Sequence, residues 1–451
     1  MALNQYLSHW FWRPTHTPLP LWWLIIPILA VSVGAVFLIK MTSFRPCINL
    51  LALILIGFAV QQGFALMEGR GINGIRDRML HTGHALFAVE AVKQPNMLRV
   101  ARHYQTLVET GELEVYPNAT KPPGQLLFYM ATERMSRLLP WASDNMLERM
   151  ATFASFFWPL LSYFTLVPLY LLSRLYLDPK QAYVPCILYL CMPPVALITL
   201  HLDQCLYPFL FVTTVALFVH GVRLKKTALL FCAGVTTSVA VFVSFSLVIL
   251  LPFIFLILAL EVIPRVAWGR TGNSENRRQL LAHAALRLIC YLSGAALVQG
   301  VFFLLLNYNV FENYRFSMSI HQGFRIEEWP LRTIVYIGCL DLLEFAIWSG
   351  GAVVSLAAVY AVRSCRRLQP SDDSCKPIVV SFCAVLLAMA FMGSTVAETA
   401  RLWIFLTPLI TLFASKELIA VFGLRSWFAA GTLAVLQVLN IFGIKMWQDF
   451  F

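Results

Sequence analysis

The sequence predicts an all-α, polytopic bundle of about twelve transmembrane helices, and three observations lead to that prediction. The chain has 451 residues, of which 59% are hydrophobic and only 13% are charged, whereas soluble domains carry about 25% charged residues. The apolar residues fall in repeated stretches of about 20, the length that crosses a bilayer as a helix with its backbone hydrogen bonds satisfied. Lysines and arginines collect in alternate loops, as they do in membrane proteins. A soluble core is therefore excluded.

The predicted spans follow from these stretches. They are 20–39, 47–66, 151–172, 181–200, 205–222, 227–244, 246–263, 285–306, 340–362, 377–393, 402–415 and 427–445. The stretch 333–362 is longer than one crossing needs. Its first part contains Asp341 and Glu344, and an interfacial or a re-entrant helix is an alternative there.

The orientation of the spans follows from the charge of the short loops. One alternate set carries most of their lysines and arginines, so it is expected to face the cytoplasm. Both termini and the long segment 67–148 then lie outside. The net charge of +11 is a topology signal under this assignment, and no nucleic-acid partner is expected. The ten cysteines show neither a disulfide framework nor the spacing of zinc ligands.

The domain organisation is predicted to be one membrane domain, 1–451, with the large outer loop 67–148 inserted in it. Residues 84–109 have helical periodicity, and Gly111 is a plausible end for that helix. The run Lys121-Pro122-Pro123-Gly124 forces an extended chain before the next helix. Residues 125–139 are amphipathic, which suits a helix lying at the headgroups.

Several short motifs accompany this arrangement. They are Glu90, Thr110-Gly111-Glu112, Lys121-Pro122-Pro123-Gly124, Glu148-Arg149-Met150, His201-Leu202-Asp203-Gln204, the run from Glu398 to Pro408 with Arg401 and Trp403, and the outer loop 307–332 with His321, Arg325 and Trp329. Together they resemble the GT-C superfamily of membrane glycosyltransferases, which includes protein mannosyltransferases, aminoarabinose transferases and arabinofuranosyltransferases. The resemblance runs from about residue 67 to 410.

This resemblance implies a function, partners and a location. The function is transfer of a sugar, a hexose or a pentose, from a polyprenyl-phosphate donor to a lipid, glycan or protein acceptor. The chain would be a multi-pass protein of the bacterial inner (plasma) membrane with its active side outward. A divalent cation, Mg²⁺ or Mn²⁺, stays open as a cofactor because some members of the superfamily use one and others do not.

The chemistry of such a transfer selects candidate residues by type. The acceptor hydroxyl needs a general base, and the departing phosphate needs cations that form strong, charge-assisted hydrogen bonds. The candidate bases are Glu90, Asp77, Glu68 and Asp203. The candidate phosphate ligands are Lys121, Arg401 and Arg325, and the supporting residues are His84, Glu398, His201 and His321.

A structural interpretation stands beside each catalytic one. Glu90 fits a solvated helix face, and Asp77 lies between two arginines and fits a local ion pair. Glu68 follows the second span directly, and the alternative interpretation is that it marks the end of that span. Glu398 and Arg401 lie one helical turn apart and fit a structural pair.

Two other functions remain open from the sequence. A transporter or flippase also has about twelve spans, but no repeated halves are visible and few charges lie at bilayer depth. A GT-C-fold subunit without activity is the other alternative, because the acidic pair usual at the start of the family's outer loop is absent here.

Overall fold

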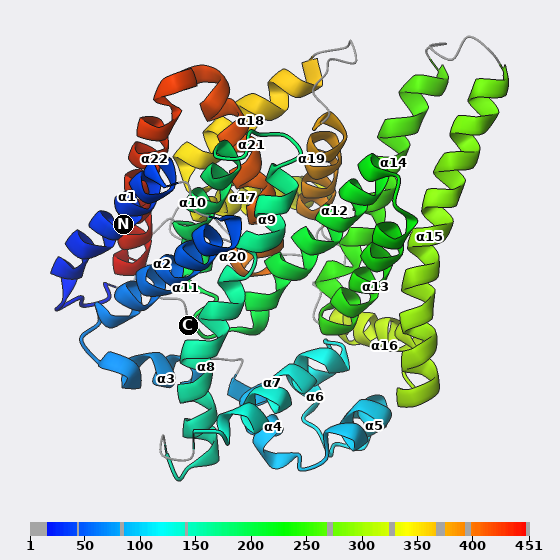
Figure 1. Cartoon of the computed structure of the whole chain (residues 1–451). Coiled ribbons are helices and arrows are strands. Elements are labelled where there is room, and N and C mark those ends of the chain that lie inside the picture. The colour runs from blue at the N-terminus through cyan, green and yellow to red at the C-terminus, as the bar shows by residue number, and fades with distance from the viewer. Residues whose placement is uncertain are drawn as a thin grey trace.

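The computed structural model confirms the all-α fold class. It describes residues 16–42, 45–81, 85–139, 143–267, 274–323, 330–366, 375–392 and 398–447, and these contain helices and connecting turns but no strand. The long helices lie side by side, and the short helices α3 to α7 gather at one end of the bundle (Figure 1). We call that end the loop side, because it carries the segment between the second and third long helices.

The helices that build the body of the bundle come from all parts of the chain. They are α1 (Ile25–Met41), α2 (Pro46–Leu66), α8 (Met146–Tyr163), α9 (Leu166–Ser173), α10 (Val184–Leu190), α11 (Pro193–Leu197), α12 (Tyr207–Leu224), α13 (Thr227–Val243), α14 (Leu250–Ala267), α15 (Ser274–Leu306), α17 (Leu331–Ser349), α18 (Gly351–Arg366), α19 (Lys376–Phe391), α21 (Thr407–Phe422) and α22 (Ser426–Trp447).

The expected count of about twelve spans is not confirmed. By length and apolar composition, the described residues hold seven helical stretches able to cross a membrane, or up to eight if one bent pair counts as a span. That pair is α17 and α18, and the chain bends by 115° between them. The pair occupies the stretch that is longer than one crossing needs. Three further apolar helices are shorter than 18 residues.

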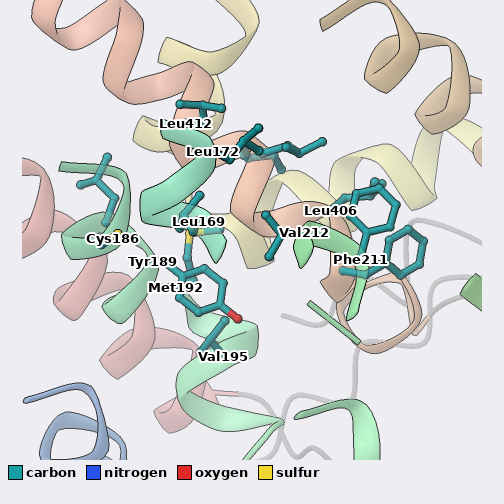
Figure 2. Close-up of a cluster of buried hydrophobic side chains, with 14 of the residues drawn as sticks. Leu169, Leu172, Cys186, Tyr189, Met192, Val195, Phe211, Val212, Leu406 and Leu412 are labelled. Atoms are coloured by element: carbon teal, nitrogen blue, oxygen red, sulfur yellow. The ribbon is translucent and has the colours of Figure 1, made fainter. Parts of the chain in front are cut away.

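The main core lies between helices that are far apart in sequence. Leu169 and Leu172 of α9, Tyr189 of α10, Phe211 of α12 and Leu412 of α21 are all fully buried there, and Figure 2 shows them converging on one cluster. Apolar side chains line all sides of these helices, as expected where a helix is surrounded by others.

Close backbone contact joins α13 to α15. A Cβ atom on Gly234 would collide with the carbonyl oxygen of Tyr291, and one on Gly294 would collide with that of Phe231. Small residues at such crossings are a common way for membrane helices to approach closely. Helix α15 stands at the edge of the bundle, beside α13 and α14 (Figure 1).

The segment after α2 forms five short helices. They are α3 (Gly71–His81), α4 (Ala85–Lys93), α5 (Met97–Glu109), α6 (Val115–Asn118) and α7 (Pro123–Ser136). Asn96 caps α5 by accepting from the backbone N–H of Arg99 at 3.0 Å. Gly111 has a positive φ of 76°, the conformation that glycine adopts readily after a helix.

Helix α7 is the centre of this segment. It packs against α4, α5, α8 and α13, and most of its residues are buried. Gly124 lies so close to the carbonyl group of Phe242 in α13 that a Cβ atom would clash with it. Trp158 of α8 donates a hydrogen bond to the Thr132 hydroxyl of α7 at 3.2 Å. These contacts fix the start of α7 against the bundle.

Candidate functional site

Lys121 stands at the start of α7. Its backbone N–H donates to the carbonyl oxygen of Asn118 at 3.0 Å, which closes the turn after α6. Pro122 and Pro123 follow, and Pro122 has the extended conformation (φ −73°, ψ 161°) that a residue before proline prefers. The sequence Lys-Pro-Pro-Gly thereby places one cation at a rigid, closely packed helix start.

Asp203 begins the short 3-10 helix η5 (Asp203–Leu206), which leads into α12. Its side chain is fully buried. It accepts hydrogen bonds from the hydroxyl of Tyr207 at 3.1 Å and from that of Tyr129, in α7, at 3.4 Å. Burial, and then the neighbouring Asp203 carboxylate, raise the pKa of Tyr129 well above its usual value, so that hydroxyl keeps its proton and donates it.

Arg401 lies in α20 (Thr399–Leu402), just before α21. It forms an ion pair with Glu398 at 2.5 Å, so the predicted pair exists. Glu398 has a φ of 85°, uncommon for a non-glycine residue. Its backbone N–H donates to Glu344 of α17 at 3.1 Å. The fully buried Trp403 packs edge-on against Phe345 of α17, with ring centroids 5.5 Å apart.

These three parts of the chain meet around Lys121. Burial lowers the pKa of Lys121, and repulsion by the Arg401 guanidinium lowers it further. The carboxylates of Asp203 and Glu398 act in the opposite direction and do not outweigh those two effects. Two cations and two carboxylates, contributed by the loop segment, by η5 and by α20, therefore interact at one place on the loop side.

Two buried glutamines adjoin these residues in the sequence. Gln125 is on the same face of α7 as Tyr129, one turn away, and Gln204 follows Asp203. Both side chains are fully buried, and neither amide has a hydrogen-bond partner among the residues that the structure describes. Buried amides in native proteins are normally paired, so these two are available to a polar ligand.

The other candidate bases lie elsewhere or have local partners. Asp77 is ion-paired with Arg70 at 2.5 Å and is partly exposed, so its partner is neither of the two arginines beside it. Glu90 is 3% exposed, not solvated as the face reading expected, and Lys93 donates to it at 3.0 Å. Its second carboxylate oxygen is buried and has no partner in the described chain.

Glu68 joins the loop segment to the last helix. It pairs with Arg78 of α3 at 2.8 Å and with Lys445 of α22 at 2.5 Å. Burial would raise the pKa of Glu68, but Lys445 and then Arg78 outweigh burial and lower it. The contacts of Glu68 are thus those of a structural ion cluster.

The remaining predicted residues are placed only in part. His201 is 2% exposed, in the turn before η5. His84, Arg325 and the side chain of His321 lie outside the described residues. The described part of the chain contains no group of three His, Cys, Asp or Glu residues able to hold a metal ion, so a role for Mg²⁺ or Mn²⁺ stays a prediction of the resemblance.

Sequence reasoning did not select Tyr129, Tyr207 or Gln125 for the site. Tyr207 lies four residues after Asp203 at the start of an apolar helix, and that spacing could have indicated a contact. Tyr129 and Gln125 look like ordinary residues of an amphipathic helix, and only the packing of α7 against α8 and α13 brings them inside.

The fold defines the class of this chain as an all-α, multi-pass integral membrane protein. No protein-family model matches it, and no curated protein matches its sequence. Solved structures that resemble it include the Archaeoglobus fulgidus oligosaccharyltransferase in complex with Zn and sulfate, at 13% identity and a TM-score of 0.44 over 73% of this chain and 45% of the other.

A second similar structure is the archaeal oligosaccharyltransferase AglB from Archaeoglobus fulgidus with an inhibitory peptide and a dolichol-phosphate. Its identity is 12% and its TM-score 0.44, over 73% of this chain and 48% of the other. The chain aligns with a little under half the length of each of these structures.

Proposed function

We propose that this chain is a glycosyltransferase that moves a hexose or pentose from a polyprenyl-phosphate donor to an acceptor hydroxyl on the loop side of the membrane. The observation that carries the proposal is the electrostatic interaction of Lys121 with Arg401 and with the fully buried Asp203, which come from three distant segments. By the distribution of basic loops, the loop side is the outer face of the plasma membrane.

The two cations fit the donor phosphate. Lys121 and Arg401 repel each other in the unliganded chain, and a phosphate between them would turn that repulsion into two charge-assisted interactions. As the sugar leaves, the bridging oxygen gains negative charge, and a cation placed there stabilises the transition state more than the bound donor.

Asp203 fits the general base. Glu398 is exposed and already paired with Arg401 at 2.5 Å, which leaves Asp203 as the buried carboxylate of the site. The contact from Tyr129 is long, at 3.4 Å, so an acceptor hydroxyl can displace it. The tighter bond from Tyr207 at 3.1 Å then orients the carboxylate.

The proposed step is an inverting displacement. The acceptor oxygen forms a bond to the anomeric carbon while the bond from that carbon to the phosphate oxygen breaks. The acceptor proton passes to Asp203, and the electron pair of the broken bond stays on the polyprenyl phosphate, held by Lys121 and Arg401. Asp203 returns the proton to water after the products leave.

The test is a transfer assay with the purified full chain in lipid vesicles. Polyprenyl-phosphate mannose, glucose and arabinose serve as donors, and release of polyprenyl phosphate is followed. Asp203→Asn should lower the rate by about 10²- to 10⁴-fold, the usual effect of losing a general base, without weakening the binding of the donor. Asp77→Asn, which alters only a surface pair, is the matched control. Full turnover in Asp203→Asn would contradict the assignment of the base.

The binding of polyprenyl phosphate, measured in the same vesicles, tests the roles of Lys121 and Arg401. Lys121→Ala and Arg401→Ala should each weaken the binding of polyprenyl phosphate, whereas Lys93→Ala should not. Equal binding by all three variants would show that the phosphate lies elsewhere. Failure of every donor to react or bind would remove the proposed function itself.

A further inference from the structure

A polar hollow lies on the loop side, and its lining does not include Asp203. Its walls are α5 on one side and the junction between α15 and α16 (Val310–Gly323) on the other. The volume of the hollow is about 250 Å³, just below the usual range of small-molecule sites. The three helices lie together at one corner of the bundle (Figure 1).

Both walls of this hollow contain a distorted backbone. His103 has non-helical angles (φ −124°, ψ 22°) inside α5, where a regular helix has about −63° and −42°. Across the hollow, Asn307 has a φ of 52°, the left-handed conformation in which a glycine or an asparagine commonly ends a helix, here α15. The chain therefore leaves the regular helical path in both walls of the hollow.

An unpaired hydroxyl group also lines the hollow. Tyr308 is 3% exposed, and its hydroxyl has no hydrogen-bond partner among the described residues. The ring is held in place by Phe242, which it meets edge-on with ring centroids 5.1 Å apart. A buried hydroxyl without a partner is costly, so a ligand or water molecule that reached it would be bound favourably.

The charges of the lining side chains favour a neutral ligand. One arginine, Arg102, and one histidine, His103, stand beside two carboxylates, Glu109 and Glu312. Phosphate sites are built from excess cations, and that excess is absent from the lining. The other lining groups are amides and hydroxyls, from Gln105, Thr106, Asn307, Asn313 and the two tyrosines Tyr104 and Tyr308. Such groups both donate and accept, which matches the hydroxyl groups of a sugar.

The hollow is connected to the proposed catalytic site through one carbonyl group. The Tyr104 hydroxyl, in the wall of the hollow, donates to the carbonyl oxygen of Asn118 at 2.9 Å. The backbone N–H of Lys121 donates to the same oxygen at 3.0 Å. The wall of the hollow and the phosphate-binding lysine are therefore built on one shared turn.

We infer that this hollow binds neutral sugar residues of a glycan acceptor, which makes a glycan, and not a protein or a bare lipid, the acceptor class. The inference rests on the proposed function for its role in transfer. The binding of a saccharide in the hollow is independent of that function and can be measured without a donor.

The experiment uses the full chain in nanodiscs and saturation-transfer NMR. The probes are neutral tetrasaccharides of glucose, mannose, galactose and N-acetylglucosamine. At least one should receive saturation from the protein. Thr106→Trp, which fills the hollow from an exposed position, should reduce that signal at least about fivefold by removing the space for the ligand. Leu98→Trp, at an exposed position of the same helix outside the hollow, is the matched control and should leave the signal unchanged.

Further arms separate the possible failures. Glu312→Gln keeps side-chain size and should weaken the signal even if the tryptophan variant folds poorly. Arg401→Ala should keep saccharide binding while losing polyprenyl phosphate, so the two proposals can fail separately. Three results would overturn the inference. They are the absence of a saturation-transfer signal for all four tetrasaccharides, an unchanged signal in both Thr106→Trp and Glu312→Gln, and displacement of the saccharide by inorganic phosphate.

Discussion

Lys121 and Arg401 repel each other as like charges in the folded chain. Most helices of the bundle come between these two residues in the sequence. Together with burial, this repulsion lowers the pKa of Lys121 below its ordinary value of 10.5. Two cations are held close in this way at a cost to stability, which suggests that the arrangement serves a ligand. The predictions below follow from this relationship and from the packing around it.

Replacing Lys121 by a neutral residue should stabilise the unliganded protein while it abolishes binding of polyprenyl phosphate. Lys121→Leu removes a cation whose charged form is disfavoured by its surroundings, so the melting temperature should rise by roughly 2 °C, the shift that about 1 kcal/mol produces in a large domain. Lys226→Leu, at an exposed position after α12, is the control. A lower melting temperature for Lys121→Leu, measured in the same detergent, would show that the lysine is a structural ion-pair partner.

The same lowered pKa sets a pH dependence for phosphate binding. Because Lys121 loses its proton at a lower pH than a free lysine does, affinity for polyprenyl phosphate should fall as pH rises through that lowered pKa, before 10.5 is reached. In that window the unfolded chain binds more protons than the folded one, so the stability of the unliganded protein should rise with pH. Lys121→Arg keeps its charge throughout and should move the loss of affinity to higher pH. An identical pH profile for the two proteins would contradict the assignment.

The ion cluster of Glu68 should support stability and not activity. Lys445→Met leaves the buried Glu68 carboxylate with Arg78 as its remaining partner, and breaking a buried pair of this kind costs about 3 kcal/mol. Thermal unfolding should detect the loss, and the double variant Glu68→Gln with Lys445→Met should recover part of it. Transfer per folded molecule should stay within about twofold, since these groups are outside the proposed site. A large loss of turnover at normal stability would return Glu68 to the candidate bases.

The start of α7 should tolerate no side chain at position 124. A Cβ atom there would collide with the carbonyl group of Phe242, so Gly124→Ala should destabilise the protein by about 1–3 kcal/mol, the usual cost of overpacking. Gly34→Ala, at a helical glycine with no atom within 4 Å of its Cβ position, is the control. Equal melting temperatures for the two variants would show that α7 does not pack on α13 as described.

The sequence predicts the positions of the helices far better than it predicts the contacts between them. Apolar stretches of membrane-spanning length locate most of the helices of the body, because hydropathy and helix length are local properties. The site depends on contacts between distant segments, and periodicity says nothing about these. Asp203 and Lys121 could be selected because charged residues are rare in such a chain. The burial of Glu90 beside α7 could not be foreseen, since its helix looked amphipathic and solvated.

The sequence predicts which types of residue the site contains, but not which individual residues belong to it. Four carboxylates qualified as candidate bases. Only the folded chain separates Asp203, which interacts with Lys121, from Asp77, which pairs with Arg70, and from Glu68, which pairs with Arg78. Tyr129 enters the site because α7 turns one face inward against α8. The amphipathic pattern of α7 predicts that one face is apolar, but it does not show that this face packs against the bundle beside Asp203.

The most direct test of the account is a double-mutant cycle on the affinity for polyprenyl phosphate. The four proteins are the wild type, Lys121→Ala, Arg401→Ala and the double variant, each in nanodiscs of the same lipid. If both side chains hold one phosphate, their effects should be coupled by about 0.5–3 kcal/mol, as for residues that share a partner. Effects that add within about 0.5 kcal/mol, the behaviour of independent distant sites, would contradict the convergence of Lys121 and Arg401 on a single donor.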